Sequence, residues 1–142
     1  MRRNSEAVLA LALTALLGLG FWLFADDTVV GEGGPDAGPI EVDPQAAARG
    51  ETLSTDTGCL ACHTVDGTPS TGPTWKGLAG SSRPLASGET VTADANYLTL
   101  SIVDPNSQVV SGFDSVMPTT YRDQLSERDI NDLVEYIQSL AG

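Results

Sequence analysis

The sequence predicts an all-α protein in which one membrane-spanning helix precedes a small domain of three to four short helices. Three observations predict this class. Residues 7–24 form a long apolar run, apolar residues near the C-terminus recur at helical spacing, and no segment shows a convincing alternation of strands. A chain of 142 residues has room for one small domain and an appendage.

The apolar run is the first predicted element. Two arginines precede residues 7–24, Thr14 is the only polar residue within them, and two aspartates follow. A helix over this run would be roughly 27 Å long, close to the hydrocarbon thickness of about 30 Å. The charge pattern places the N-terminus in the cytoplasm and the rest of the chain on the outer side. We therefore expect residues 1–25 to be a single-pass anchor in the cytoplasmic membrane, with the domain on the periplasmic or outer side.

A cleaved signal peptide is the alternative interpretation of the same residues. The run exceeds the typical apolar signal core of about 7–15 residues. Cleavage after Ala25 would also put Leu23 where a small residue is preferred. The sequence thus favours a retained anchor, and both interpretations deliver the domain to the same side of the membrane.

Residues 26–42 are predicted to form a flexible linker. They are rich in glycine, proline and acidic residues and show no apolar periodicity. A flexible segment of this length has an end-to-end distance of roughly 20–25 Å. The folded domain is therefore expected to span residues 43–142 and to be held near the membrane surface.

Two helices are predicted from their start signals. Asp43 is a suitable N-cap and Pro44 suits the first helical position. The small residues of 45–53 continue this first helix. Thr92 or Asp94 starts the second, which ends before the next proline.

The C-terminal helix is the clearest element. Ser126 is a good N-cap, and Asp129 is placed to complete a capping box. We expect the small-residue face around Gly50 to pack against this helix, and residues 64–91 to form loops. The apolar residues at helical spacing are Ile130, Leu133, Val134, Ile137 and Leu140.

The motif Cys59-Leu60-Ala61-Cys62-His63 uses both cysteines and the one histidine of the chain. C-x-x-C-H is the attachment motif of c-type haem. Its two thiols add across the haem vinyl groups as thioethers, and the imidazole becomes an axial ligand of the iron. The sequence therefore predicts one haem c, bound covalently through Cys59 and Cys62, with His63 on the iron.

Other uses of the same three residues explain the pattern less well. A structural zinc site needs four cysteine or histidine ligands and a catalytic site needs three, usually from separate segments. A thioredoxin-like pair would need a βαβ pattern nearby. A simple disulfide would leave His63 without a role.

Met117 is the candidate for the second axial ligand. It is the only methionine apart from the initiator, and it precedes Pro118 in a predicted loop. A thioether ligand raises the potential of haem iron and leaves no open position for oxygen. The alternatives are a methionine that fills a core gap, or ligation by a tyrosine or by Lys76, the only lysine.

The non-ligating ring nitrogen of His63 is expected to donate to a backbone carbonyl, which would fix the orientation of the ring. Residues 71–75 are placed to offer that carbonyl, and Pro73 would stiffen the segment.

The chain carries a net charge of −12. Such an acidic surface repels nucleic acid and favours a partner with a basic docking patch. The rate of association with that partner should fall as the salt concentration rises. The alternative is that the acidic residues serve only to keep the protein soluble and attract no particular partner.

These features together resemble class I cytochromes c over residues 43–140. The shared positions are Gly50 with Tyr136 in the terminal helices, the haem motif, Gly72-Pro73 and Met117-Pro118. Within that class, residues 72–105 resemble the cytochrome c domain fused to subunit II of caa3-type oxidases.

The resemblance implies a class I fold in which the carbonyl of Pro73 accepts from His63 and Met117 is the distal ligand. It also implies that Trp75 and Arg83 lie near the haem propionates. The chain has no cysteines left for a copper centre, so it is not itself an oxidase subunit II. It also lacks the lysine-rich docking ring of soluble basic cytochromes.

The predicted function is single-electron transfer between redox complexes of a respiratory or photosynthetic chain, without enzymatic activity. The expected partners are a quinol-oxidising complex, a terminal oxidase or a reaction centre, and the lipid bilayer, but no nucleic acid. A fixed cytochrome subunit of such a complex is the alternative. A haem enzyme or gas sensor would need a labile sixth ligand and a distal acid–base residue, and the chain has no second histidine.

Overall fold

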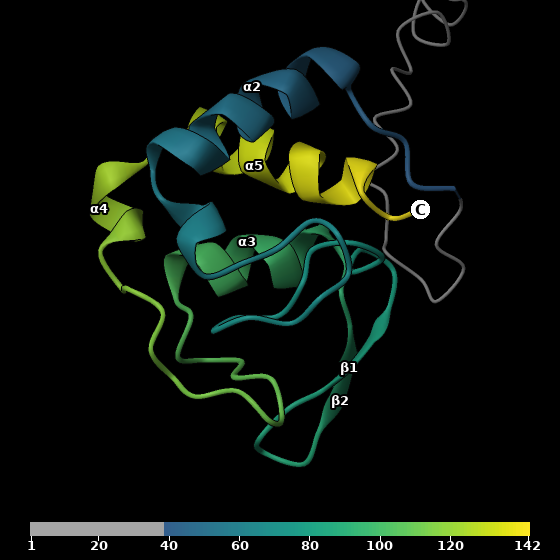
Figure 1. The fold of residues 1–142 in the computed structure, drawn as a ribbon, viewed down its shortest axis with the longest axis vertical. Coiled ribbons are helices and arrows are strands. Elements are labelled where there is room, and N and C mark those ends of the chain that lie inside the picture. Colours follow the sequence, from purple (N-terminus) through teal and green to yellow (C-terminus); the bar gives the residue numbers. More distant parts are fainter. Residues whose placement is uncertain (1–38) are drawn as a thin grey trace, which may run out of the picture. The chain divides into compact units, whose positions relative to one another are not determined.

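A computed structural model describes residues 39–142 (Figure 1). The predicted anchor, residues 1–25, and most of the predicted linker, residues 26–42, lie outside the described residues. Within residues 39–142, no helix is long and apolar enough to span a membrane.

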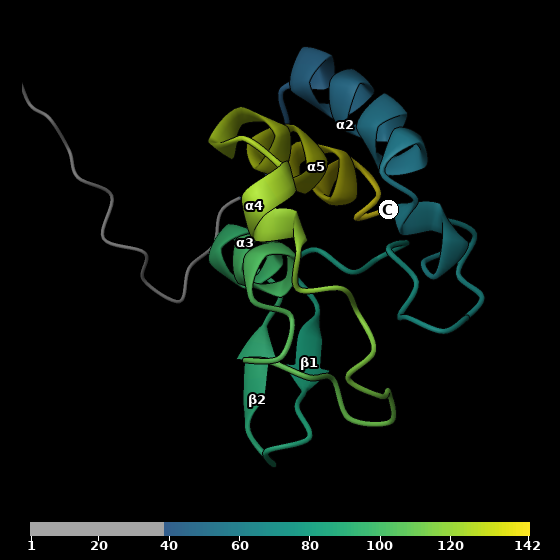
Figure 2. The same cartoon turned by 90° about the vertical axis from the view of Figure 1, so that its left-hand side faces the viewer.

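The described domain consists mainly of short helices joined by long loops. The two terminal helices, α2 and α5, lie side by side, and α3 lies next to α5 in both views (Figures 1 and 2). The elements in chain order are α2 (Pro44–Asp56), the 3-10 turn η2 (Cys59–Ala61), β1 (Ser82–Pro84), β2 (Thr90–Thr92), α3 (Ala95–Val103), α4 (Tyr121–Gln124) and α5 (Glu127–Ser139).

The predicted helix starts are confirmed. The Asp43 carboxylate accepts from the backbone N–H of Gln45 at 2.8 Å and caps α2. Asp94, rather than Thr92, caps α3. Ser126 and Asp129 form the capping box at the start of α5. In each case a side-chain oxygen satisfies a backbone donor that the first helical turn leaves without a partner.

The all-α prediction is wrong in one segment, because the predicted loop of residues 64–91 contains strand β1 and begins β2. The two strands pair antiparallel, with Arg83 opposite Val91. The hairpin lies on the far side of α3 from α5 (Figure 2). Strands of three residues show only one alternation of side chains, and Pro84 is typical of edge strands, so the sequence carries almost no strand signal.

Gly50 allows α2 and α5 to cross in direct backbone contact. A Cβ atom at this position would lie 1.9 Å from the carbonyl oxygen of Asp132 and 2.8 Å from the Cβ of Tyr136. No side chain fits in that space. The predicted packing of the Gly50 face against the C-terminal helix is therefore confirmed.

A bidentate ion pair joins α2 and α5 at the same crossing. Arg49 donates from Nε to Oδ2 of Asp132 and from Nη2 to Oδ1, both at 2.7 Å. Asp132 is buried, whereas Arg49 is partly exposed. The hydrogen bonds from Arg49 lower the pKa of Asp132 below its ordinary value of 3.8.

We expect Asp132→Asn to destabilise the domain at neutral pH and to have a smaller effect at acid pH, once the wild-type carboxylate is protonated. A carboxylate with a lowered folded-state pKa contributes stability above its ordinary pKa and loses that contribution as the pH falls through the folded value. Chemical denaturation of the wild type and the variant at pH 7 and at a series of decreasing acid pH values measures the difference. Asp56→Asn, at an exposed position in the same helix α2 as Arg49, is the control, and a loss of stability that stays equal over the whole series would contradict the prediction.

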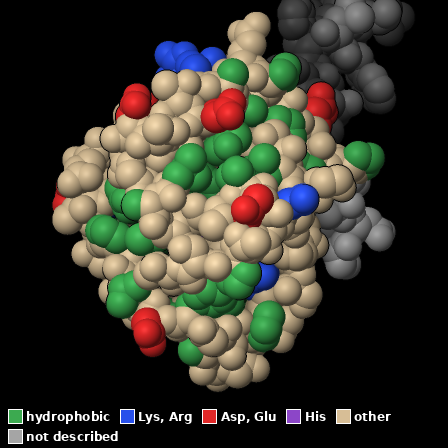
Figure 3. All heavy atoms as spheres, viewed as in Figure 1, with side chains coloured by type: hydrophobic (Ala, Val, Ile, Leu, Met, Phe, Trp, Pro, Cys, Tyr) green, Lys and Arg blue, Asp and Glu red, His purple; other side chains and the backbone are tan. Residues whose placement is uncertain are grey.

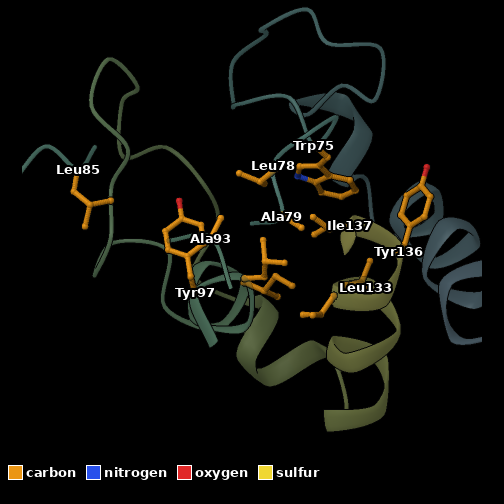
Figure 4. Close-up of a cluster of buried hydrophobic side chains, with 12 residues drawn as sticks. Trp75, Leu78, Ala79, Leu85, Ala93, Tyr97, Leu133, Tyr136 and Ile137 are labelled. Atoms are coloured by element: carbon orange, nitrogen blue, oxygen red, sulfur yellow. The ribbon is translucent and has the colours of Figure 1, made fainter. Parts of the chain in front are cut away.

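The hydrophobic core lies between α5, α3 and the loop that carries Trp75 (Figure 4). Leu133, Val134 and Ile137 of the predicted apolar stripe are buried, and Ile130 and Leu140 pack against them partly exposed. The side chain of Trp75 meets the Tyr136 ring edge-on at 6.0 Å between ring centroids. The core thus joins the terminal helices to the segment that follows the haem motif.

Candidate functional site

The haem motif lies in a tight turn directly after α2. Gly58 begins the turn with φ = +77°, a left-handed conformation that favours glycine. The backbone N–H groups of Cys62 and His63 both donate to the carbonyl of Cys59, at 3.2 and 3.0 Å. This turn brings the two cysteines and the histidine close together.

The His63 ring is held from two sides. Its Nδ1 lies 2.8 Å from the carbonyl oxygen of Pro73, so the hydrogen bond expected from the sequence is present. Its face stacks on Trp75, with ring centroids 5.1 Å apart and an interplanar angle of 24°. Burial lowers the pKa of His63, which favours the neutral imidazole. With Nδ1 donating to Pro73, the lone pair of Nε2 is left for a metal.

Gly72 makes room for this ring. A Cβ at Gly72 would lie 2.6 Å from Cε1 of His63 and 2.8 Å from Nδ1. The backbone N–H of Gly72 also donates to the carbonyl of Cys62 at 2.8 Å, which ties the loop to the motif. The Gly72-Pro73 pair therefore has two separate roles, since the glycine permits close approach and the proline supplies the acceptor.

A cavity of about 220 Å³ adjoins the ring. Its wall contains Cys59, Cys62 and His63 from the motif and Met117 from the distant loop. The structure thus brings together residues that lie more than fifty positions apart in the sequence. Two candidates from the resemblance, Pro73 and Trp75, also line the cavity, whereas Arg83 lies on β1 outside the lining.

These residues fit haem c. Gly72 leaves room for the His63 ring, and the donor set of two thiols, one imidazole and one thioether matches the chemistry of a covalently held haem. The wall is mainly aliphatic and aromatic, as a large apolar group requires. When bound, haem supplies an iron atom that exchanges one electron between its ferric and ferrous states.

The wall also contains polar residues that the sequence does not single out, among them Tyr121, Ser101 and Gln108. Tyr121 donates its hydroxyl to the carbonyl of Thr57 at 3.4 Å and lines the cavity beside the motif. Ser101 and Gln108 line it as well. For Ser101 a signal exists, because it is a polar residue on the apolar face of α3; nothing in the sequence distinguishes Gln108 from other loop residues.

We expect Gly72→Ala to weaken iron ligation by His63 by about tenfold, the lower end of what loss of a ligand's supporting contacts costs. The added methyl group would displace the ring and break its hydrogen bond to Pro73. The measurable result is a lower yield of haem-loaded protein and a high-spin component in the ferric absorption spectrum. Ser70→Ala, in the same loop, is the control. A wild-type spectrum and yield for Gly72→Ala would contradict this account of the ring.

Comparisons with known proteins identify the family of the chain. The family model for cytochrome c matches residues 47–141. Among solved structures, the chain is similar to cytochrome cH from Methylobacterium extorquens, with 26% sequence identity over 66% of this chain and 97% of that chain and a TM-score of 0.47. No curated protein sequence matches the chain.

The family match covers most of α2, the haem motif, the loop of Met117 and all of α5. Cytochrome c domains bind haem c through thioether bonds to two cysteines. Cys59 and Cys62 have the spacing of that attachment motif. The chain therefore belongs to the cytochrome c family, and it is a covalent haem c electron carrier rather than an enzyme.

Proposed function

We propose that the protein is a membrane-anchored monohaem cytochrome that carries single electrons between redox complexes on the outer face of the cytoplasmic membrane. The anchor would be residues 1–25, because their apolar run has arginines before it and aspartates after it. The linker of residues 26–42 would let the haem domain reach partners near the membrane without diffusing away.

The observation that carries the electron-transfer part of the proposal is that His63 and Met117 line one cavity. As the two axial ligands they would fill both open positions of the iron. Pro73, Gly72 and Trp75 restrain the His63 ring. A restrained ligand set keeps nearly the same geometry in both oxidation states, which favours electron transfer over substrate binding.

Electrons would enter and leave where the cavity reaches the surface. Cys62 is exposed, and Val116, another wall residue, is 60% exposed. Exposed apolar side chains at a redox site suit a small, short-lived contact with a partner. We place the docking surface at this edge.

The charge of the chain supports a partner with a basic docking patch. The chain has 19 acidic and 7 basic residues. Figure 3 shows one face on which hydrophobic side chains gather and acidic side chains are scattered around them. Electrostatic steering then predicts an association rate that falls as salt rises.

The resemblance to the cytochrome domain of caa3-type oxidases suits a terminal oxidase as one partner. A quinol-oxidising complex or a reaction centre is an equally suitable partner, because both lie in the membrane and can offer a basic docking patch to an acidic cytochrome. A fixed subunit of such a complex is the second candidate, and the apolar run contains Gly18 and Gly20, which permit close helix approach.

A pull-down in gentle detergent tests the proposal. The tagged full-length protein is recovered from native membranes, and haem absorbance and copurifying proteins are read together at low and high salt. The proposal predicts recovery from the membrane fraction with partners that are lost at high salt. A stoichiometric, salt-resistant complex would instead identify a fixed subunit, and recovery from the soluble outer fraction would contradict the anchor.

A further inference from the structure

The loop that carries Met117 is exposed on both sides of the methionine. Met117 itself is partly buried, whereas the three residues before it and the three residues after it are exposed. Residues 114–119 make no backbone hydrogen bond to any other part of the described chain. The position of Met117 over the cavity must therefore be set by side chains that hold the loop at its two ends.

Two side chains hold this loop to the segment around the end of α3. Before Met117, the hydroxyl of Ser115 donates to the side-chain oxygen of Asn106. After it, Arg122 donates from Nε to the carbonyl of Val103 at 3.2 Å, which joins α4 to the end of α3. Neither hydrogen bond reaches the haem motif, so neither fixes the distance between Met117 and the turn that would carry the haem.

Tyr121 supplies the connection between the loop and the haem motif. It follows Met117 by four positions, and its hydroxyl donates to the carbonyl of Thr57 at 3.4 Å. Within residues 39–142, no other hydrogen bond joins residues 114–125 to residues 57–63. The side chain of Tyr121 lines the cavity together with Met117 and Cys59. It therefore lies where the loop and the attachment turn meet.

Thr57 is a firmly held acceptor for this hydrogen bond. It is the C-cap of α2, and both its backbone N–H and its hydroxyl donate to the carbonyl of Leu53, at 2.9 and 2.7 Å. Its hydroxyl oxygen also lies 3.2 Å from Sγ of Cys59, the first cysteine of the haem motif. The hydroxyl of Tyr121 thus ties the loop to a fixed point two residues before the first haem attachment.

We propose that the hydrogen bond from Tyr121 to Thr57 positions Met117 and slows its release from ferric haem. A thioether favours ferrous over ferric iron, so restraint by the protein matters most when the iron is ferric. Tyr121 acts through Met117 and is a positioning residue. The inference rests on the proposed ligation of the iron by Met117 and not on membrane anchoring.

Binding of imidazole to the ferric, haem-loaded protein tests the inference. Imidazole binds the iron only after Met117 leaves, so the rate at saturating imidazole measures the release of Met117. Tyr121→Phe keeps the aromatic ring and removes the donor. We expect this variant to raise the rate about two- to tenfold, the range that corresponds to one ordinary hydrogen bond. Tyr136→Phe, the same change at a tyrosine outside the cavity lining, is the matched control and should keep the wild-type rate.

The same substitution in a Met117→Ala background separates positioning of the methionine from a general loosening of the domain. With no methionine to release, Tyr121→Phe should leave imidazole binding unchanged. An equal acceleration in both backgrounds, or no acceleration in the protein that retains Met117, would overturn the inference and leave ligation by Met117 intact. If Met117→Ala alone binds imidazole no faster than the wild type, Met117 is not the ligand, and the proposed ligation fails together with the inference.

Discussion

Met117→Ala is expected to lower the midpoint potential of the haem by about 0.1 V or more, since the identity of the axial ligands moves haem potentials over a range of about 0.8 V. Met117 is the proposed distal ligand because it lines the cavity that also holds His63. A thioether ligand favours ferrous iron, and its loss should favour the ferric state. The ferric absorption spectrum should change as well, because water or another weak ligand would replace the sulfur.

Redox titration and absorption spectroscopy of the purified protein check this expectation. Thr119→Ala is the matched control, because it truncates an exposed side chain of the same loop that is not part of the cavity wall. It should leave both the potential and the spectrum unchanged. If Met117→Ala behaves like Thr119→Ala, methionine is not a ligand of the iron, and the second axial position must be assigned to another group.

Gly50→Ala is expected to destabilise the domain by about 2–3 kcal/mol, in the range measured for overpacked cores. The new methyl group would lie 1.9 Å from the carbonyl oxygen of Asp132. That oxygen belongs to the backbone of α5, so only a separation of α2 from α5 would relieve the clash. The higher helix propensity of alanine, worth up to about 1 kcal/mol, offsets part of the cost.

Denaturation of the haem-loaded protein, followed by circular dichroism, measures this effect. Thr55→Ala, at an exposed position of α2, is the control, and it should be neutral or slightly stabilising. A Gly50→Ala protein as stable as the wild type would show that the two helices can move apart at little cost. The close crossing would then not be a requirement of the fold.

The parts of the fold that sequence analysis predicted correctly are those set by residues close together in the chain. The capping residues Asp43 and Ser126 act on backbone groups within one helical turn, so their pattern is readable directly. The haem motif is a five-residue signature, and the apolar stripe of α5 follows a fixed period. In each case the physical cause lies within a short window of sequence.

The parts that sequence analysis missed depend on distant residues. The hairpin of β1 and β2 is too short to show periodicity, and its pairing continues through the contact of Leu85 with Val110. Arg83 was placed near the propionates by resemblance, but it lies on β1 outside the cavity lining. That role for Arg83 stays a prediction.

The pairing of Gly72 with His63 lies between these two cases. The sequence indicated that a carbonyl in residues 71–75 would accept from the ring, and Pro73 supplies it at 2.8 Å. Position 72 needs a glycine because any Cβ atom there would lie only 2.6 Å from the His63 ring. Such a contact depends on the path of the loop in space, which no local pattern encodes.

We propose that the protein's own side chains, His63 and Met117, fill both axial positions of one haem and so dedicate it to electron transfer. Exposure of the reduced full-length protein to carbon monoxide at neutral pH tests whether both positions are filled. We predict that the absorption spectrum stays unchanged and that the haem still titrates as a single one-electron centre. Rapid carbon monoxide binding would show an open or labile position on the iron and would contradict the claim.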